Sequence, residues 1–183
     1  ATQLIWDLGA ILVTASGIRA GDDVLDVACG TGNTALRAAA TGAAVVGCDL
    51  TPASLAVGRR EADRLGLTIN WVPGDAEALP FPDDAFDVVT SSVGAMWAPD
   101  HQAVADELVR VCRPGGTIAM INFAAGGKIE DFLAVFDGFA PAPPPWAESP
   151  VLWGDPEHVR RLFGDRVDRL EFTSGTYLER VPG

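Results

Sequence analysis

The sequence predicts an α/β fold in which helices cover both faces of a doubly wound, mostly parallel sheet. Short segments rich in Val, Ile and Leu alternate with longer segments of helical character, which is typical of this architecture. Gly, Pro and Asp residues separate these segments at short intervals. Near the end of the chain, two strand-like segments meet at Ser174-Gly175, so we expect an antiparallel C-terminal strand or hairpin.

In the first half of the chain, helices are expected to alternate with strands. An apolar stripe at helical spacing predicts a helix over Thr2–Ser16, which Gly17 ends. The strands that we expect next are Val24–Val27, Ala44–Cys48 and Thr68–Val72. The helices between them are Thr34–Ala40 and a segment from Pro52 to about Leu65, with Thr51 as N-cap and Gly66 as the stop.

In the second half, the alternation continues and then loosens. We expect a fourth strand over Phe86–Ser91, a helix that opens at Pro99-Asp100 and runs to about Cys112, and a fifth strand over Thr117–Phe123 after the break at Pro114-Gly115-Gly116. Next come a helix over Ile129–Phe139, a proline-rich segment (Ala140–Pro150) and a helix capped at Asp155 that ends at Phe163. The hairpin strands are Val167–Phe172 and Thr176–Val181.

Length and composition are those of one globular domain, residues 1–183. A hydrophobic content of 48% excludes a disordered chain. The apolar runs are too short to cross a bilayer and no signal peptide precedes Trp6, so we expect a cytoplasmic protein without membrane contact. The net charge of −12 argues against a nucleic-acid partner. The chain begins without Met, which fits either trimmed ends or the lack of disordered ends, so substrate-binding elements can lie outside the sequence.

A glycine loop between the first strand and the following helix is the most informative segment. Gly30 and Gly32 permit close approach of the backbone to a ligand, as in nucleotide-binding folds. The same pattern fits a dinucleotide site or a tight turn without a ligand. Asp26 separates these cases, because an acidic residue suits a cofactor with a cationic group better than it suits a pyrophosphate.

Two further acidic residues follow later strands. Asp49 ends the second strand about 20 residues beyond the first glycine, where a carboxylate can accept hydrogen bonds from two ribose hydroxyls. It could instead cap the next helix, although Thr51 is expected to do so. Asp75 follows Gly74 in the loop after the third strand. With the backbone N–H of Ala76 it would match the donor and acceptor of an adenine edge, while Gly-Asp alone is also an ordinary turn.

These segments, together with Phe86–Ser91 and the region Leu108–Gly116, resemble in order and spacing the class I S-adenosylmethionine-dependent methyltransferases. Ala28 stands where that family often has its first glycine. The closest resemblance is to the type 11 small-molecule branch, which is akin to the quinone-biosynthesis methyltransferases. It implies a Rossmann-like sheet, S-adenosylmethionine as cofactor, a small-molecule acceptor, and a monomer or homodimer. The implied cofactor-binding residues are Asp26, Ala28, Gly30, Thr31, Gly32, Asp49, Leu50, Gly74, Asp75, Ala76 and Ser91.

His101 is the best candidate for a general base if the acceptor is a hydroxyl, because its ordinary pKa lies near neutrality. It could equally be a polar residue in the first turn of a helix. His158 is expected on a solvated helix face beside Arg160 and Arg161. We expect Cys29 to fill space in the loop, although a cysteine before a helix can be a nucleophile.

The remaining cysteine and aromatic residues leave several interpretations open. The three cysteines have no metal-ligand spacing, so the sequence predicts reduced thiols and no metal site. The aromatic residues near the carboxyl ends of the strands could line an acceptor pocket or belong to the core; they are Trp97, Phe123, Trp146 and Trp153. Two other functions remain open, a nicotinamide-dependent oxidoreductase and a catalytically degenerate cofactor-binding module.

Overall fold

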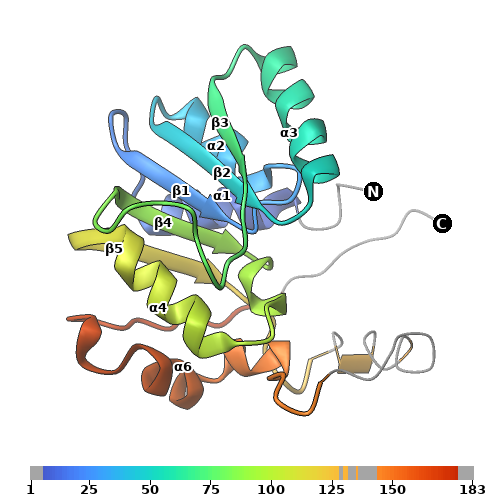
Figure 1. Ribbon diagram of the computed structural model, residues 1–183, viewed down its shortest axis with the longest axis vertical. Helices are drawn as coiled ribbons and strands as arrows, with labels where there is room; N and C mark the ends of the chain where they lie inside the picture. Colours follow the sequence, from blue (N-terminus) through green and yellow to red (C-terminus); the bar gives the residue numbers. More distant parts are fainter. Residues whose placement is uncertain (1–5, 128–129, 132–134, 136–143, 177–183) are drawn as a thin grey trace.

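The computed structural model describes residues 6–127, 130–131, 135 and 144–176. They form a parallel five-stranded sheet of order β3-β2-β1-β4-β5 (Figure 1). The strands are β1 (Asp23–Val27), β2 (Ala44–Asp49), β3 (Ile69–Pro73), β4 (Phe86–Ser92) and β5 (Cys112–Ile121). This confirms the predicted parallel α/β sheet. Because β1 lies between β2 and β4, the strand order reverses at β1, and ligands bind at such a point beyond the carboxyl ends of the strands.

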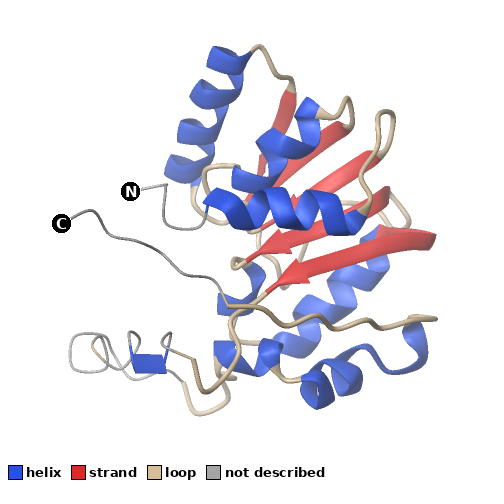
Figure 2. Ribbon diagram, turned by 180° about the vertical axis from the view of Figure 1, so that it is seen from behind, coloured by secondary structure: helices blue, strands red, loops and turns tan. Residues whose placement is uncertain are grey.

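Helices lie on both faces of the sheet, as predicted. The helices are α1 (Trp6–Ser16), α2 (Asn33–Ala40), α3 (Pro52–Leu65), α4 (His101–Val111) and α6 (Pro156–Phe163), and the short 3-10 helices are η1 (Ala95–Trp97), η2 (Pro150–Gly154) and η3 (Gly164–Arg166). In Figure 2, α1 and α2 lie in front of the sheet and α4 lies behind it. None of the helices in these described ranges is long and apolar enough to span a membrane.

The sheet separates two hydrophobic cores. Neighbouring β1 residues point to opposite faces, so Val24 packs with Leu36 and Trp71, whereas Leu25 packs in the core that contains Leu108. Val24 and Leu25 are both fully buried. Burial on both faces explains why neighbouring residues of β1, Val24 and Leu25, are both apolar.

Local capping residues set several of the predicted helix ends. The side chain of Asp100 accepts a hydrogen bond from the N–H of Ala103 at the start of α4, and Asp155 does the same for Glu157 in α6. Gly66 ends α3 with a φ of 69°. Thr51 precedes α3 as expected, but its side chain makes no capping bond.

The C-terminal part differs from the prediction. Residues 114–116 do not separate α4 from the fifth strand, because they belong to β5, whose register against β4 shifts between Phe86 and Val88. The predicted strand Val167–Phe172 is wrong, since residues 167–176 contain no strand. The second hairpin strand, apart from Thr176, and most of the predicted helix Ile129–Phe139 lie outside the described residues. Within residues 144–176 the structure therefore has no antiparallel C-terminal strand.

Candidate cofactor site

The glycine loop joins the carboxyl end of β1 to α2. Gly30 has a φ of 56° and Gly32 a φ of 87°, a region that favours glycine. A Cβ atom built on Gly30 would meet nothing within 4 Å, so this part of the loop faces open space. Thr31 lies between the two glycines and is half-buried. The loop thus leaves room for a ligand in front of Gly30.

Gly32 serves a different contact, which the sequence did not reveal. A Cβ atom on Gly32 would lie 2.4 Å from Cη2 of the Trp71 ring. Equivalent Cβ atoms on Gly47 and Gly58 would lie 2.9 Å and 2.6 Å from the same ring. The glycines of the loop, β2 and α3 therefore form a slot for the Trp71 indole. This residue fixes the loop against β2 and α3.

Backbone strain marks the neighbouring edge of the sheet. Ala28, at the end of β1, has a φ of 52°, and Val93, just after β4, has a φ of 55°. The left-handed region is costly for alanine and more so for a β-branched residue. Gly94 packs against Ala28 so closely that a Cβ atom there would lie 2.2 Å from the Ala28 carbonyl oxygen. Strained residues of this kind cluster at functional sites, and the sequence pattern gave no sign of Val93 or Gly94.

Asp26 is buried and links β1 to α2 and β4 through hydrogen bonds. Its Oδ2 accepts a hydrogen bond from the N–H of Ala35 in α2, and its Oδ1 accepts one from the Thr90 hydroxyl in β4. The side chain is 1% exposed, and burial raises the pKa of Asp26 to about 7. Asp26 therefore holds α2 against β1 and β4. A direct contact with a cationic group of a ligand stays a prediction.

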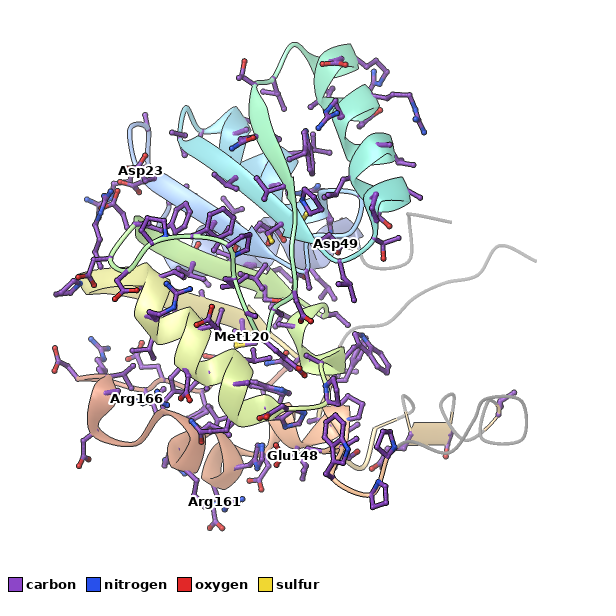
Figure 3. The ribbon with its side chains drawn as sticks, viewed as in Figure 1. Asp23, Asp49, Met120, Glu148, Arg161 and Arg166 are labelled. Carbon is purple, nitrogen blue, oxygen red and sulfur yellow. The ribbon has the colours of Figure 1, made fainter. Side chains whose placement is uncertain are left out.

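Asp49 lies half-buried at the carboxyl end of β2 and points toward the glycine loop (Figure 3). Its Oδ2 accepts a hydrogen bond from the N–H of Gly30 at 2.7 Å, and its Oδ1 accepts one from the N–H of Thr51 at 2.8 Å. Thr51 occupies the N-cap position of α3 as predicted, but the Asp49 carboxylate, not the Thr51 side chain, accepts a hydrogen bond from an amide at the start of that helix. The same carboxylate borders the open space in front of Gly30. Leu50, beside it, is 71% exposed.

The loop after β3 lies next to Asp49. The N–H of Gly74 donates to the backbone oxygen of Asp49, and a Cβ atom on Gly74 would lie 2.7 Å from Sγ of Cys48. Close packing therefore explains this glycine. Asp75 is exposed, and its Oδ1 accepts a hydrogen bond from the N–H of Glu77, which is the turn alternative that the sequence left open. Ala76 next to it is half-buried.

The carboxyl end of β4 carries buried polar groups. Ser91 is fully buried, and its Oγ accepts a hydrogen bond from the N–H of Ala95, so it supports the start of η1. Oγ of Ser92 and Oδ1 of Asn122 are buried without a hydrogen-bond partner. Ser92 pairs with Ile121 in the sheet, so the two unsatisfied groups come from the ends of adjacent strands. Buried polar atoms without partners are rare and call for a ligand or water.

The two histidines lie together and away from the glycine loop. His101 is fully buried, and its Nδ1 lies 3.0 Å from Nε2 of His158. The prediction of a solvated His158 is wrong, because this side chain is 5% exposed. Burial lowers the pKa of His101, which keeps the imidazole neutral. Its proposed role as a general base gains no support from the structure, since the ring is closed to solvent.

The aromatic and thiol groups divide between surface and core. Trp153 is buried beside His101, whereas Trp97 and Trp146 are 49% and 64% exposed. Phe123 is half-buried. Cys29 is a free, buried thiol, and burial raises its pKa far above the usual value, which supports the expectation that it fills space in the loop. The other two cysteines are also free and buried.

The arrangement at the carboxyl ends of β1, β2 and β3 fits an adenosyl group. The Asp49 carboxylate can accept ribose hydroxyls, exposed Leu50 offers an apolar surface, and Asp75 can accept an exocyclic amine. The open space in front of Gly30 leaves room for the rest of such a ligand. The fold and this edge together are those of an α/β domain suited to an adenosyl ligand.

Comparison with known proteins identifies the family. A family model described as a methyltransferase domain matches residues 24–116. An uncharacterized protein of Mycobacterium tuberculosis is 47% identical over 175 residues, which are 96% of this chain and 64% of that protein. A demethylmenaquinone methyltransferase of Thermus thermophilus is 45% identical over 102 residues, 55% of this chain and 46% of that enzyme. A solved structure, from work on the conversion of a disulfide bond into a thioacetal group during echinomycin biosynthesis, is 34% identical with a TM-score of 0.68, and the match covers 87% of this chain and 70% of that one.

The chain therefore belongs to the class I S-adenosylmethionine-dependent methyltransferases, as its motifs predicted, and S-adenosylmethionine is the cofactor. The family match does not favour a nicotinamide-dependent oxidoreductase. The chain spans 64% of the length of its mycobacterial relative.

Proposed function

We propose that this domain transfers a methyl group from S-adenosylmethionine to a small-molecule acceptor. The observation that carries the proposal is the Asp49 carboxylate, which lies 2.7 Å from the Gly30 N–H and borders the open space in front of the loop. When bound, the cofactor supplies an electrophilic methyl group on a sulfonium. The work left to the protein is alignment of the two reactants, which can contribute about 7–11 kcal/mol to lowering the barrier.

In this proposal each loop has one task. Asp49 orients the ribose, and the glycine loop permits close approach of the backbone. Asp75 and the N–H of Ala76 hold the adenine edge. Asp26 acts indirectly, because its bonds to Ala35 and Thr90 fix the start of α2.

The acceptor side of the proposed site lies at the ends of β4 and β5. Ser92 Oγ and Asn122 Oδ1 are buried there without partners, so they would bind a polar atom of an acceptor only if side chains that cover them move. The acidic chain supports a neutral or cationic small molecule as acceptor over a nucleic acid. A cytoplasmic location, and a monomeric or homodimeric state, stay predictions.

Isothermal titration calorimetry tests the cofactor site. We expect the protein to bind S-adenosylmethionine and S-adenosylhomocysteine and not to bind NAD or NADP. The Asp49→Ala variant should weaken binding of S-adenosylhomocysteine about tenfold or more, because hydrogen bonds to a charged group contribute about 1.5–3 kcal/mol.

The matched control is Asp63→Ala, which removes an exposed carboxylate from α3 and should leave the affinity unchanged. Because Asp49 also binds the N–H groups of Gly30 and Thr51, thermal melts must show that the variant is folded. If the melts reveal unfolding, Asp49→Asn serves instead, since its amide oxygen can still accept one of these bonds. Parent-like affinity in a folded variant would remove Asp49 from the site, and the absence of binding by the folded parent would refute the proposed function.

A further inference from the structure

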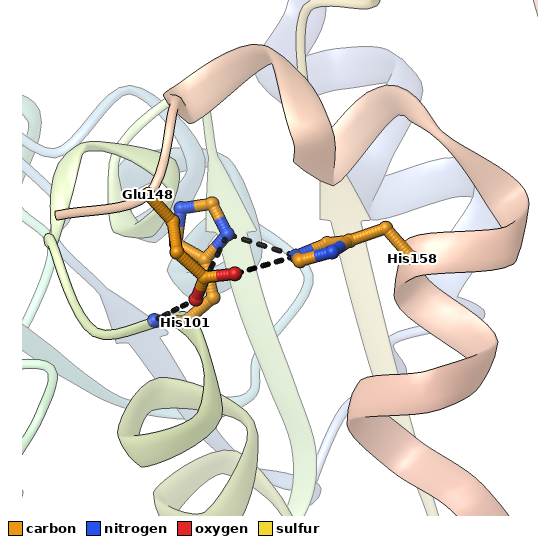
Figure 4. A group of neighbouring side chains, drawn as sticks. All are labelled: His101, Glu148 and His158. Atoms are coloured by element: carbon orange, nitrogen blue, oxygen red, sulfur yellow. Dashed lines mark hydrogen bonds and ion pairs between the residues drawn. The ribbon is translucent and has the colours of Figure 1, made fainter. Parts of the chain in front are cut away.

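A cluster of two histidines and one glutamate lies apart from the proposed cofactor site. His101 opens α4, Glu148 precedes η2, and His158 lies in α6 (Figure 4). Figure 3 shows Glu148 on a different part of the molecule from Asp49. His101 and His158 are 57 residues apart in sequence, so spacing could not reveal the cluster. None of the tasks assigned above to the cofactor site uses it.

The three side chains are spaced like ligands of one metal ion. Nδ1 of His101 lies 3.0 Å from Nε2 of His158. The same Nδ1 lies 3.8 Å from Oε2 of Glu148, and Nε2 of His158 lies 3.8 Å from Oε1 of Glu148. Two ligands bound tetrahedrally to Zn²⁺ at about 2.0–2.1 Å are separated by about 3.3–3.5 Å. The distances of 3.0 Å and 3.8 Å lie on both sides of that value, but the two 3.8 Å distances reach different oxygens of Glu148. With one ligand atom from each residue, the three atoms lie within 4.8 Å of one another, so the Glu148 carboxylate has to turn to bring one oxygen close to both nitrogens. Two imidazoles and one carboxylate are a ligand set that zinc commonly uses.

The protonation of the cluster is compatible with this reading. Arg161 is a donor only, and its Nη2 lies 3.3 Å from Nδ1 of His158, so that nitrogen accepts. In a neutral His158 the proton is therefore on Nε2, which donates to Nδ1 of His101. The lone pair of His101 thus faces the cluster. A cation can bind Nε2 of His158 only after the proton on that nitrogen has moved to Nδ1 of the same ring.

Arg161 should weaken metal binding, because the proton that moves to Nδ1 of His158 would face its guanidinium group. Once His158 binds a metal through Nε2, its Nδ1 carries a hydrogen and faces the positively charged guanidinium. The hydrogen bond between Nη2 of Arg161 and Nδ1 of His158 is lost in the metal-bound state, so Arg161 stabilises only the metal-free state. Its removal should therefore favour the metal-bound state, whereas removal of a mere structural hydrogen bond would only loosen the cluster.

The cluster is open on one side. The side chains of His101 and His158 are 0% and 6% exposed, whereas that of Glu148 is 36% exposed. Oε2 of Glu148 accepts a hydrogen bond from the N–H of His101, which leaves Oε1 toward His158. The ring of Trp153 packs 5.2 Å from the ring of His101. A cation would thus enter past Glu148, and water could complete its coordination there.

We propose that His101, Glu148 and His158 bind one Zn²⁺ ion, through Nδ1, a carboxylate oxygen and Nε2 respectively. The ion joins α4, the segment before η2 and α6. The proposal is independent of cofactor binding and of methyl transfer.

The test uses tag-free protein that has been treated with a chelator and desalted. Calorimetric titration with Zn²⁺ at neutral pH should give one site with a dissociation constant on the order of 1 µM or below. Visible absorption of Co²⁺ reports a tetrahedral site with the same ligands. Glu148→Gln keeps the amide acceptor for the His101 N–H and should weaken Zn²⁺ binding at least tenfold. Glu157→Gln, the same change at an exposed position beside His158, should leave binding unchanged.

Arg161→Gln gives the sharpest outcome, because it should tighten Zn²⁺ binding severalfold. His158→Ala should abolish Zn²⁺ binding, provided that thermal melts show a folded protein. If His158→Ala is unfolded, the Zn²⁺ affinity of Glu148→Gln is the test of the proposal. Parent-like affinity in Glu148→Gln, weaker binding in Arg161→Gln, or a dissociation constant above about 100 µM for the parent would overturn the proposal.

Discussion

At the scale of single residues, Asp26 shows how one motif position can act through structure. Its carboxyl group joins α2 to β4 through Ala35 and Thr90, and water does not reach it. Burial disfavours the charged form and raises the pKa to about 7, well above the value of 3.8 expected for an exposed aspartate. When protonated, Asp26 can donate to the Thr90 hydroxyl, which can in turn donate to the Leu25 carbonyl oxygen.

This pKa predicts a pH-dependent stability. Between about pH 4 and pH 7 the folded protein holds a proton that the unfolded chain has released, so stability falls as the pH rises through that window. Asn at this position stays neutral, and its amide can donate to Thr90 while its oxygen accepts from Ala35. From pH 5 to pH 8 we expect the unfolding free energy of the parent to fall by about 2 kcal/mol relative to Asp26→Asn.

Urea denaturation at a series of pH values measures this difference. Asp63→Asn, on the exposed face of α3, is the control and should run parallel to the parent. If Asp26→Asn also runs parallel to the parent between pH 5 and pH 8, Asp26 is ionised in the folded protein, and the hydrogen bonds that it accepts from Ala35 and Thr90 outweigh the effect of burial on its pKa.

At the scale of elements, the Trp71 slot ties together the parts that form the cofactor site. The indole lies against glycines of the loop, of β2 and of α3, where added Cβ atoms would approach to between 2.4 and 2.9 Å. Trp71 is 6% exposed. Close packing of this kind tolerates little added volume, so these elements keep one arrangement.

Gly58 in α3 gives a test with an unusual sign. Ala ordinarily stabilises a helix interior by about 1 kcal/mol relative to Gly. Here the new Cβ atom would lie 2.6 Å from Cη2 of Trp71 and 3.0 Å from the Thr31 carbonyl oxygen, and such overpacking costs about 1–3 kcal/mol. Gly58→Ala should therefore fail to stabilise the protein, and we expect it to lower the unfolding free energy by up to about 2 kcal/mol in chemical denaturation.

The same substitution in a Trp71→Phe background supplies the control. Phe lacks the outer ring atoms that meet Gly58, so Gly58→Ala should become neutral or stabilising there. Equal effects of the substitution in both backgrounds would show that Trp71 and Gly58 are not in contact.

Sequence patterns predicted those helix ends that are set by residues close by in the sequence. Asp100, Asp155 and Gly66 act within one turn of the helices that they bound, and their roles are confirmed. Residues 114–116 belong to β5 because the strand pairs with β4, which no local pattern records. The alternation over Val167–Phe172 likewise cannot form a strand unless another strand pairs with it.

The site shows the same division between local and long-range signals. Asp49 could be placed near the glycine loop because the ends of adjacent parallel strands meet at one edge of the sheet. The slot around Trp71 and the contact between His101 and His158 depend on packing between distant segments. A charged neighbourhood in sequence made His158 resemble a surface residue, although it is buried.

At the scale of the whole molecule, charge limits the partners. The chain has 25 acidic and 13 basic residues. Many of the cations are already engaged, since Arg64, Arg110, Arg113, Arg166 and Arg169 each pair with an Asp or Glu. A phosphate backbone binds through clustered basic side chains that release counterions, so these pairs would have to break first.

This balance predicts that the protein does not bind nucleic acid. Fluorescence anisotropy with a labelled single-stranded RNA and a labelled DNA duplex, each about 20 nucleotides long, should give dissociation constants weaker than about 100 µM at both 50 mM and 150 mM salt. The low-salt arm is the more demanding one, because screening is weakest there and any basic surface would show. A basic protein of similar size verifies that the probes respond. Micromolar binding that weakens steeply with salt would contradict the prediction and reopen the choice of acceptor, since it would require a basic surface that outweighs the net charge of −12.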